Sequence, residues 1–300
     1  MTSFWLATHP ITATGTPARP GESAEVCVVG AGLTGLTTAV LLARTGRRVV
    51  LVEARSVGAV ASGNTTAKLS LLQGSVLSEL RRRHAAEVVH AYVESNRAGQ
   101  EWLNAFLGGA GVAVEDRTAW TYASGPEGVD RLERELSAAT AAGLAVTRDD
   151  ATELPFPVAG AIRLDHQLQF HATAVLDALL SDFLAHGGVL HTGCRVRGLR
   201  VRERVELLTS DSAVLADHVV LATGTPCADR GGHFAMLQPQ RSYALDGRTS
   251  TLSAVCTHLG GVVSWNEAER SWDCPLHGSR FSADGTVLEG PATSDLERLG

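Results

Sequence analysis

The sequence predicts an α/β domain with a smaller α+β insertion, followed by a small all-β domain at the C-terminal end. Three observations carry this prediction. A glycine-rich turn joins a strand to a helix within residues 25–53, a run with helical periodicity covers residues 75–107, and paired Cys and His residues lie within residues 256–277. We expect an N-terminal tail over residues 1–21, a main domain over residues 22–245 with its insertion at about 75–165, and a C-terminal domain over residues 246–300.

Composition limits the classes of function. The chain has 300 residues, of which 44% are hydrophobic and 19% charged, enough for one sizeable core and a small satellite domain. A net charge of -6 argues against a nucleic-acid partner. No apolar run reaches the ~18 residues of a membrane span, and the N-terminus lacks the basic start and apolar core of a secretory signal. Together with the low cysteine content, this predicts a cytoplasmic protein.

The first unit along the chain is a strand, a glycine turn, a helix and a second strand. Residues 25–29 (EVCVV) form a short apolar run, a helical pattern continues through Arg44, and residues 48–52 (RVVLV) form another buried strand. A unit of about 30 residues with this pattern is typical of βαβ. A G-x-G-x-x-G turn inside it, with an acid about 20 residues on, indicates dinucleotide binding.

The residues of this motif have separate expected roles. Gly30 permits the turn, Gly32 lets a pyrophosphate reach backbone N–H groups at the helix N-terminus, and Gly35 allows close packing. Glu53 would accept hydrogen bonds from ribose hydroxyls. An acid at this position disfavours a 2′-phosphate and therefore NADP, whereas NAD and FAD both remain open. A glycine turn without any ligand is the structural alternative.

The insertion is expected to be α+β and to bind substrate. Its periodicity predicts helices within residues 75–107 and over residues 128–142, with short strands over 112–114 and 118–122 and a loop at 154–157.

The chain then returns to the main sheet. His171 begins the next helix, where packing or capping is a better expectation than catalysis, and Cys27 and Cys194 are expected to be core residues. The predicted elements are a helix over residues 172–186, a strand over 189–191, a meander over 194–201, 205–209 and 213–215, and a strand that begins at Val219.

Two short motifs near the C-terminus supply a paired ligand set. Residues 256–261 (CTHLGG) and 274–279 (CPLHGS) contribute one Cys and one His each, namely Cys256, His258, Cys274 and His277. Two thiolates and two imidazoles are the ligands of a Rieske-type [2Fe-2S] cluster, whose His ligands raise its reduction potential. A four-ligand zinc site is the alternative. Zinc motifs usually run Cys-Cys and then His-His, so the mixed halves favour the iron-sulfur cluster.

Residues 61–70 (ASGNTTAKLS) resemble the flavin-contacting loop of FAD-dependent oxidoreductases related to D-amino acid and glycine oxidases. Within the loop, Thr65, Thr66 and Lys68 match the branch of that family that carries a C-terminal Rieske domain. Residues 219–226 resemble the Ala-Thr-Gly motif of the same flavoproteins, and the C-terminal run resembles their Rieske domain. The resemblance implies FAD as cofactor, with contacts from these loop residues, from Thr223 and Gly224, and from the backbone of Val196 to the adenine.

The resemblance also implies an activity. An amine or amino-acid-like small molecule would give two electrons to FAD, which would pass them singly to the [2Fe-2S] cluster and then to an unidentified acceptor. No catalytic base is assigned, and Tyr243 is a candidate for substrate contact. A non-catalytic electron-transfer protein and an inactive shortened remnant are the alternatives.

This chain departs from the family pattern in two places. Gly261 and Leu276 occupy positions where many Rieske domains carry two further cysteines that form a disulfide. Members of the family also continue with further strands where this chain reaches Leu245, and Rieske domains have several strands before their first ligand loop. We therefore expect an internal deletion between Leu245 and Gly247.

Overall fold

The computed structural model contains two compact units. The large unit spans Trp5–Phe234, and the small unit spans Ala235–Gly300 together with Met1–Phe4. The structure describes residues 3–19, 21–150, 152, 157–209, 212–224, 251–257, 262–266, 270–274, 278–289 and 291–299. Cys227, Tyr243 and the expected junction at Leu245 lie outside these residues.

The large unit is built on a six-stranded sheet in the order β7-β2-β1-β10-β9-β8. The central strand β1 pairs in parallel with β2 and β10, β2 pairs in parallel with β7, and β10, β9 and β8 are antiparallel. The strands are β1 (Glu22–Val29), β2 (Val49–Val52), β7 (Val189–His191), β8 (Gly198–Val201), β9 (Val205–Leu208) and β10 (Ala213–Leu221).

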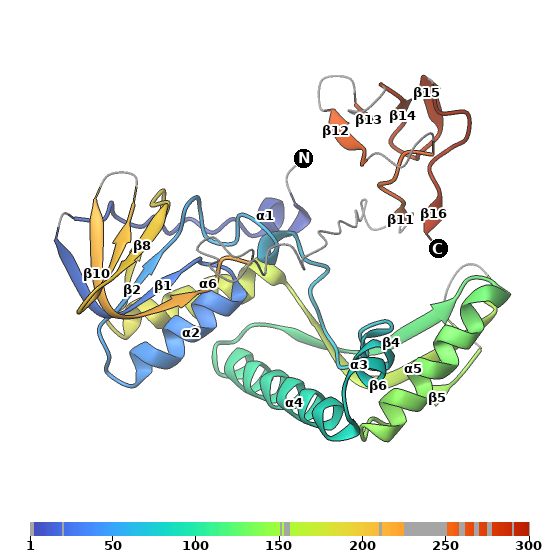
Figure 1. Cartoon of the computed structure of the whole chain (residues 1–300), viewed down its shortest axis with the longest axis horizontal. Coiled ribbons are helices and arrows are strands. Elements are labelled where there is room, and N and C mark those ends of the chain that lie inside the picture. The colour runs from blue at the N-terminus through green and yellow to red at the C-terminus, as the bar shows by residue number, and fades with distance from the viewer. Residues whose placement is uncertain are drawn as a thin grey trace. The chain divides into compact units, whose positions relative to one another are not determined.

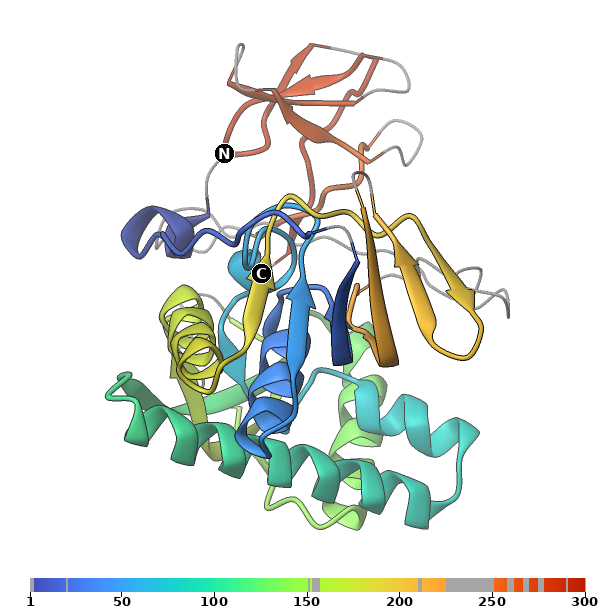
Figure 2. The ribbon, with the colours of Figure 1, turned by 90° about the vertical axis from the view of Figure 1, so that its left-hand side faces the viewer.

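Both faces of this sheet are covered. On one face, α2 (Leu33–Arg44) and α6 (Ala172–Ala185) pack against each other and on the sheet (Figure 2), where Val28 and Leu51 meet Leu36 and Leu176. On the other face, Cys27 lies in a cluster of buried apolar residues with Val50, Cys194 and Leu207. Burial on both faces explains why β1 and β2 read as continuous apolar runs. Burial also raises the pKa of the Cys27 thiol to about 12, as expected of a core residue.

A second sheet, in the order β3-β6-β4, lies beside this core (Figure 1). β6 pairs with β4 along one side and with β3 and β5 along the other, and α5 packs on β4 and β6. The elements are η1 (Ser62–Asn64), β3 (Lys68–Leu69), α3 (Val76–Arg83), α4 (Ala86–Gly109), β4 (Val114–Ala123), η2 (Pro126–Gly128), α5 (Val129–Ala141), β5 (Thr147–Arg148) and β6 (Gly160–Phe170). A short helix, α1 (Phe4–Thr8), precedes the sheets in sequence.

Three expectations about secondary structure were wrong, and one strand was missed. The two strands expected at 112–114 and 118–122 are one strand, β4, with an irregular register between Arg117 and Ala119. The strand β6 was not expected at all. Residues 213–221 form a single strand, and the segment expected as a strand from Cys194 is regular only from Gly198. For β4, β6 and β10 a pairing partner that is distant in sequence defines the strand, whereas β8 pairs with its neighbour β9.

The small unit is all-β. β12 to β15 form an antiparallel meander, and β11 pairs with β16. Its core contains Trp272 and Phe281 packed with both Cys256 and Cys274. The strands are β11 (Thr251–Leu252), β12 (Ser264–Asn266), β13 (Ser271–Asp273), β14 (Arg280–Phe281), β15 (Val287–Glu289) and β16 (Arg298–Leu299). Within the described parts of both units, no helix is both long enough and apolar enough to span a membrane.

Candidate functional site

The turn between β1 and α2 requires glycine. Gly30 has a φ of +107°, and a Cβ there would lie 2.4 Å from the carbonyl oxygen of Ala222. A Cβ on Gly35 would lie 1.8 Å from the Gly30 carbonyl oxygen, so α2 packs directly on the turn. Only glycine tolerates both this φ and this approach. The turn, the start of α2 and the segment after β10 therefore meet at one edge of the sheet, at the carboxyl ends of β1 and β10.

The N-terminus of α2 offers backbone amides to an anion. Its first internal bond runs from the Leu36 amide to the Gly32 carbonyl at 2.9 Å, so the amides of residues 33–35 have no partner within the helix. The Leu33 amide donates to Ser62 Oγ at 2.9 Å. Such a helix end favours phosphate binding. Sequence reasoning missed Ser62, whose only signal is a hydroxyl in the loop after the second strand.

Glu53 lies at the carboxyl end of β2, next to the turn. Its Oε2 accepts a hydrogen bond from the Ala31 amide at 2.8 Å, and its Oε1 accepts one from the Arg55 amide at 2.8 Å. The Glu53 amide donates to the His191 carbonyl, and the Cys194 amide donates to the Glu53 carbonyl, each at 2.8 Å. The carboxylate is therefore fixed in place by backbone contacts from three segments.

Three further predicted residues, Val196, Thr223 and Gly224, lie close to this arrangement. Val196, two residues beyond Cys194, is half-buried and packs against the cluster around Cys27. The Ala222 amide donates to the Val29 carbonyl at 2.8 Å, which brings Thr223 and Gly224 next to the glycine turn. The Thr223 Cα would lie 3.5 Å from a Cβ on Gly30, and Gly224 has a φ of +71°.

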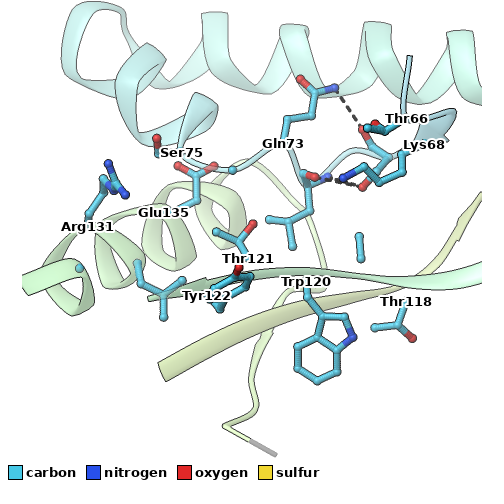
Figure 3. A pocket seen from close by; sticks show the side chains of 16 residues that line it. Thr66, Lys68, Gln73, Ser75, Thr118, Trp120, Thr121, Tyr122, Arg131 and Glu135 are labelled. Carbon is cyan, nitrogen blue, oxygen red and sulfur yellow. Dashed lines mark hydrogen bonds between the residues drawn. The ribbon is translucent and has the colours of Figure 1, made fainter. Parts of the chain in front are cut away.

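The predicted flavin loop links this edge to the second sheet. Ser62 bonds to the start of α2, whereas Lys68, six residues later, pairs with Gln169 in β6. The Thr65 carbonyl accepts a hydrogen bond from Trp5 Nε1 at 2.6 Å. Thr66 and Lys68 line a cavity of about 810 Å³ (Figure 3). The loop therefore runs from the phosphate-binding position toward the cavity.

The donor set at this edge fits the ADP half of FAD. Amides at the N-terminus of α2 suit a pyrophosphate. A carboxylate has about four acceptor positions, and the two backbone bonds to Glu53 use two of them, so the others can accept ribose hydroxyls. Gly30, Gly32, Gly35, Glu53, Thr223 and Gly224 thus come together, while Thr65, Thr66 and Lys68 extend from them along one loop.

The two cysteines of the predicted cluster come together in the small unit. Cys256 is 2% exposed and Cys274 is 3% exposed, and neither forms a disulfide with another described cysteine. The bridge between Val255 and Val262 closes the loop that begins at Cys256. The Gly278 amide donates to the Cys274 carbonyl at 3.0 Å and closes the other loop, with Gly278 at a φ of +80°.

The two histidines of the predicted ligand set, His258 and His277, lie outside the described residues. The described residues alone consequently contain no group of three or more metal ligands. Ser279 is fully buried, and its Oγ accepts a hydrogen bond from the Ala292 amide at 3.0 Å, which leaves the hydroxyl proton available to a nearby acceptor. Two buried thiols at the bases of two short loops, with a buried hydroxyl beside one of them, fit the sulfur side of a [2Fe-2S] cluster.

His171 packs rather than caps. It occupies the N-cap position of α6, but its side chain makes no capping bond there. Its Nε2 lies 2.8 Å from Thr8 Oγ1, and its ring meets the Trp5 ring edge to face at 4.9 Å. The residue therefore fastens the N-terminal segment onto α6, in agreement with the expected packing role.

A family comparison covers most of this arrangement. Residues 25–272, which include the glycine turn, Glu53 and the Ala-Thr-Gly segment, match the model of the family described as FAD dependent oxidoreductase. The chain belongs to this family. FAD is the cofactor that the family description names.

Similar sequences point to an iron-sulfur protein as well. The chain is 29% identical over 227 residues to the putative Rieske 2Fe-2S iron-sulfur protein YhfW of Bacillus subtilis, covering 74% of this chain and 44% of that protein. A cytochrome b6-f complex iron-sulfur subunit of Synechococcus is 56% identical over 46 residues in the C-terminal part, covering 15% of this chain and 27% of that subunit. The chain thus spans less than half the length of these relatives.

Solved structures share the fold of the large unit. Glycine oxidase from Geobacillus kaustophilus matches with a TM-score of 0.54 at 22% identity, covering 72% of this chain and 59% of that one. L-amino acid deaminase from Proteus myxofaciens matches with a TM-score of 0.57 at 17% identity, covering 74% and 49% respectively. The expected α/β fold of the FAD-dependent amino acid oxidases, with a separate all-β region near the C-terminus, is confirmed.

Proposed function

We propose that the protein oxidises an amine or amino-acid-like small molecule with FAD and passes the electrons to a [2Fe-2S] cluster. The observation that carries the proposal is the meeting of Gly30, Glu53 and Thr223 at one sheet edge, in a chain whose small unit buries Cys256 and Cys274 together. The names of the relatives support both cofactors.

The residues have distinct roles in this proposal. The chemistry supplied by bound FAD is two-electron oxidation beside an amine nitrogen, and that supplied by the cluster is one-electron transfer at a potential raised by its His ligands. The start of α2, with Gly30, Gly32 and Gly35, holds the pyrophosphate, and Glu53 holds the ribose. Val196 contacts the adenine through its backbone. The loop residues Thr65, Thr66 and Lys68, with Thr223 and Gly224, contact the flavin half.

In the small unit, Cys256, His258, Cys274 and His277 ligate the two irons, and the Ser279 hydroxyl donates to a cluster sulfur. The burial of both thiols supports this ligand set because a cluster shielded from water keeps its thiolate ligands from competing reactions. The proposal also places the domain boundary near residue 245 and the protein in the cytoplasm, and the lack of disulfides among the described cysteines supports the second point. The electron acceptor is left unassigned.

An absorption spectrum of the anaerobically purified full chain, with iron and acid-labile sulfide assays, tests the proposal. We expect flavin bands, cluster bands, and two iron atoms with two sulfides per chain. Flavin without a cluster would refute the electron-transfer step. A cluster without flavin would refute the oxidation and favour a non-catalytic electron-transfer protein instead.

A further inference from the structure

The cavity in the second sheet is lined by residues of β4, of the segment 66–75 and of α5. In the described part of the chain, β4 pairs only with β6, and residues from both faces of β4 line the cavity, Trp120 from one face and Thr121 from the other. The loop that carries Lys68 and the helix α5 close it on the remaining sides (Figure 3). The cavity of about 810 Å³ is therefore large enough for a small organic molecule.

Two cations face this cavity from different elements. Lys68 comes from β3, and Arg131 comes from the first turn of α5, and Figure 3 shows them at opposite ends of the lining. Neither side chain has a hydrogen-bond or ion-pair partner among the described residues. Each therefore has its full set of donors available to a ligand.

The carboxylate in the lining is bonded to a helix end rather than to either cation. Glu135 is fully buried, and its two oxygens accept hydrogen bonds from the Leu77 amide at 3.0 Å and the Ser78 amide at 2.8 Å. These amides belong to the first turn of α3, where a negative charge is favoured by the helix dipole. Glu135 is thus a cap for α3, and the described lining, with two cations and one carboxylate, keeps an excess of positive charge.

The rest of the lining is partly apolar. Trp120, Tyr122 and Leu132 contribute ring and aliphatic surface, and burial raises the pKa of Tyr122, which keeps its hydroxyl neutral. The Thr118 hydroxyl, near the Lys68 end in Figure 3, is already donated to Asp165 at 2.9 Å. The lining fits a molecule with a negative group at each end and an apolar middle.

We infer that this cavity is the substrate site and that the substrate is an amine carrying two carboxylates, one bound by Lys68 and the other by Arg131. The inference rests on the proposed function, because Lys68 belongs to the proposed flavin loop and would contact both the flavin and the substrate carboxylate. Arginine suits a carboxylate through two parallel N–H···O bonds, whereas lysine contributes a point charge. The site would therefore discriminate against neutral amino acids of the same size.

Titration calorimetry on the full chain tests the inference. Glutamate in both enantiomers is the probe. Glutamine, which has an amide in place of the side-chain carboxylate, is the comparison ligand, and inorganic phosphate at equal ionic strength controls for unspecific anion binding. The variants are Arg131→Gln and Lys68→Gln. Arg134→Gln is the matched control, because Arg134 is an exposed residue one turn along the same helix and does not line the cavity.

We expect glutamate to bind at least about tenfold more tightly than glutamine, and each cavity variant to weaken glutamate binding about tenfold while Arg134→Gln leaves it unchanged. Equal binding of glutamine or phosphate, or equal weakening by Arg134→Gln, would overturn the inference. Flavin content and flavin reduction are measured on the same samples. Flavin reduced by neutral amino acids, with no response to Arg131→Gln, refutes the dicarboxylate site and keeps the oxidation. Glutamate binding that depends on Arg131, in a protein that contains no flavin, keeps the dicarboxylate site and refutes the oxidation.

Discussion

Single residues at the sheet edge depend on one another. Glu53 holds the Ala31 amide within the glycine turn, and the same turn presses against Ala222 through Gly30. The carboxylate that would bind ribose therefore also fixes the backbone that would bind pyrophosphate. A change at either residue is expected to disturb both halves of the nucleotide site.

Gly30→Ala separates a steric requirement from a conformational one. The added Cβ would meet the Ala222 carbonyl at 2.4 Å, and the positive φ of +107° adds strain. Gly46→Ala is the control, because Gly46 has a φ of +81° but nothing within 4 Å of its Cβ position. We expect Gly46→Ala to cost about 1–2 kcal/mol of unfolding free energy and Gly30→Ala about 2–5 kcal/mol. Urea unfolding measures both, and equal losses would contradict the close approach.

Glu53→Gln tests the ribose role. The amide NH₂ of glutamine would face the backbone N–H of either Ala31 or Arg55, so one acceptor is replaced by a donor. We expect FAD to bind about ten- to a hundredfold more weakly, as measured by fluorescence of released flavin. Glu25→Gln is the control, because Glu25 accepts a similar bond from the Arg48 amide at 2.7 Å at the opposite end of the sheet. Loss of FAD in both variants would indicate a general effect on the fold.

At the scale of the elements, the N-terminal helix α1 is held by a titratable contact. Trp5 donates to Thr65 in the proposed flavin loop, and His171 contacts both Trp5 and Thr8. Burial, and secondarily the nearby His9, lowers the pKa of His171 below its ordinary value of 6.5. The folded state thus favours neutral His171, so the unfolded chain binds more protons and stability is lost as pH falls below about 6.5.

His171→Gln is expected to reduce the loss of stability at low pH. Melting temperatures of the wild type and of His171→Gln are compared between pH 7.5 and 5.5, and the wild type should fall further. The substitution does not touch the contact of His9 Nε2 with Asp177 Oδ2 at 3.2 Å. His218→Gln, on the exposed side of β10, should behave like the wild type. An equal fall in melting temperature between pH 7.5 and 5.5 for His171→Gln and the wild type would contradict the proposed role of His171.

The sequence predicted those elements whose signals are local. The βαβ unit, α5 and α6 were recognisable because periodicity and glycine position lie within each segment. β6 was missed because its burial follows no regular alternation, and His166 within it has a φ of +58°. Ser62 and Arg131 were missed because each acts through partners or a cavity formed by distant segments. Pairing and cavity shape are properties of the assembled fold, which no local pattern contains.

At the scale of the whole molecule, the two units differ in what can stabilise them. The large unit has two extended clusters of buried residues on the two faces of its main sheet and a third under α5. The small unit has one cluster, which includes Cys256 and Cys274 themselves. A domain of about 60 residues buries only about 60% of the surface of its unfolded chain. We therefore expect metal binding to contribute a large share of the stability of the small unit.

Cys256→Ser is expected to unfold the small unit and leave the large one folded. Serine is a poor ligand for iron, so iron and sulfide should fall to background, and hydrogen exchange should rise in residues 251–299 but not in the main sheet. Cys194→Ser is the matched control, because Cys194 is also a buried cysteine outside any disulfide among the described residues, but lies in the core of the large unit. It should keep its iron and lose stability only in the large unit. Since the proposed FAD site lies entirely within Trp5–Phe234, Cys256→Ser should also retain flavin, and joint loss of flavin and iron would show that the two units fold as one.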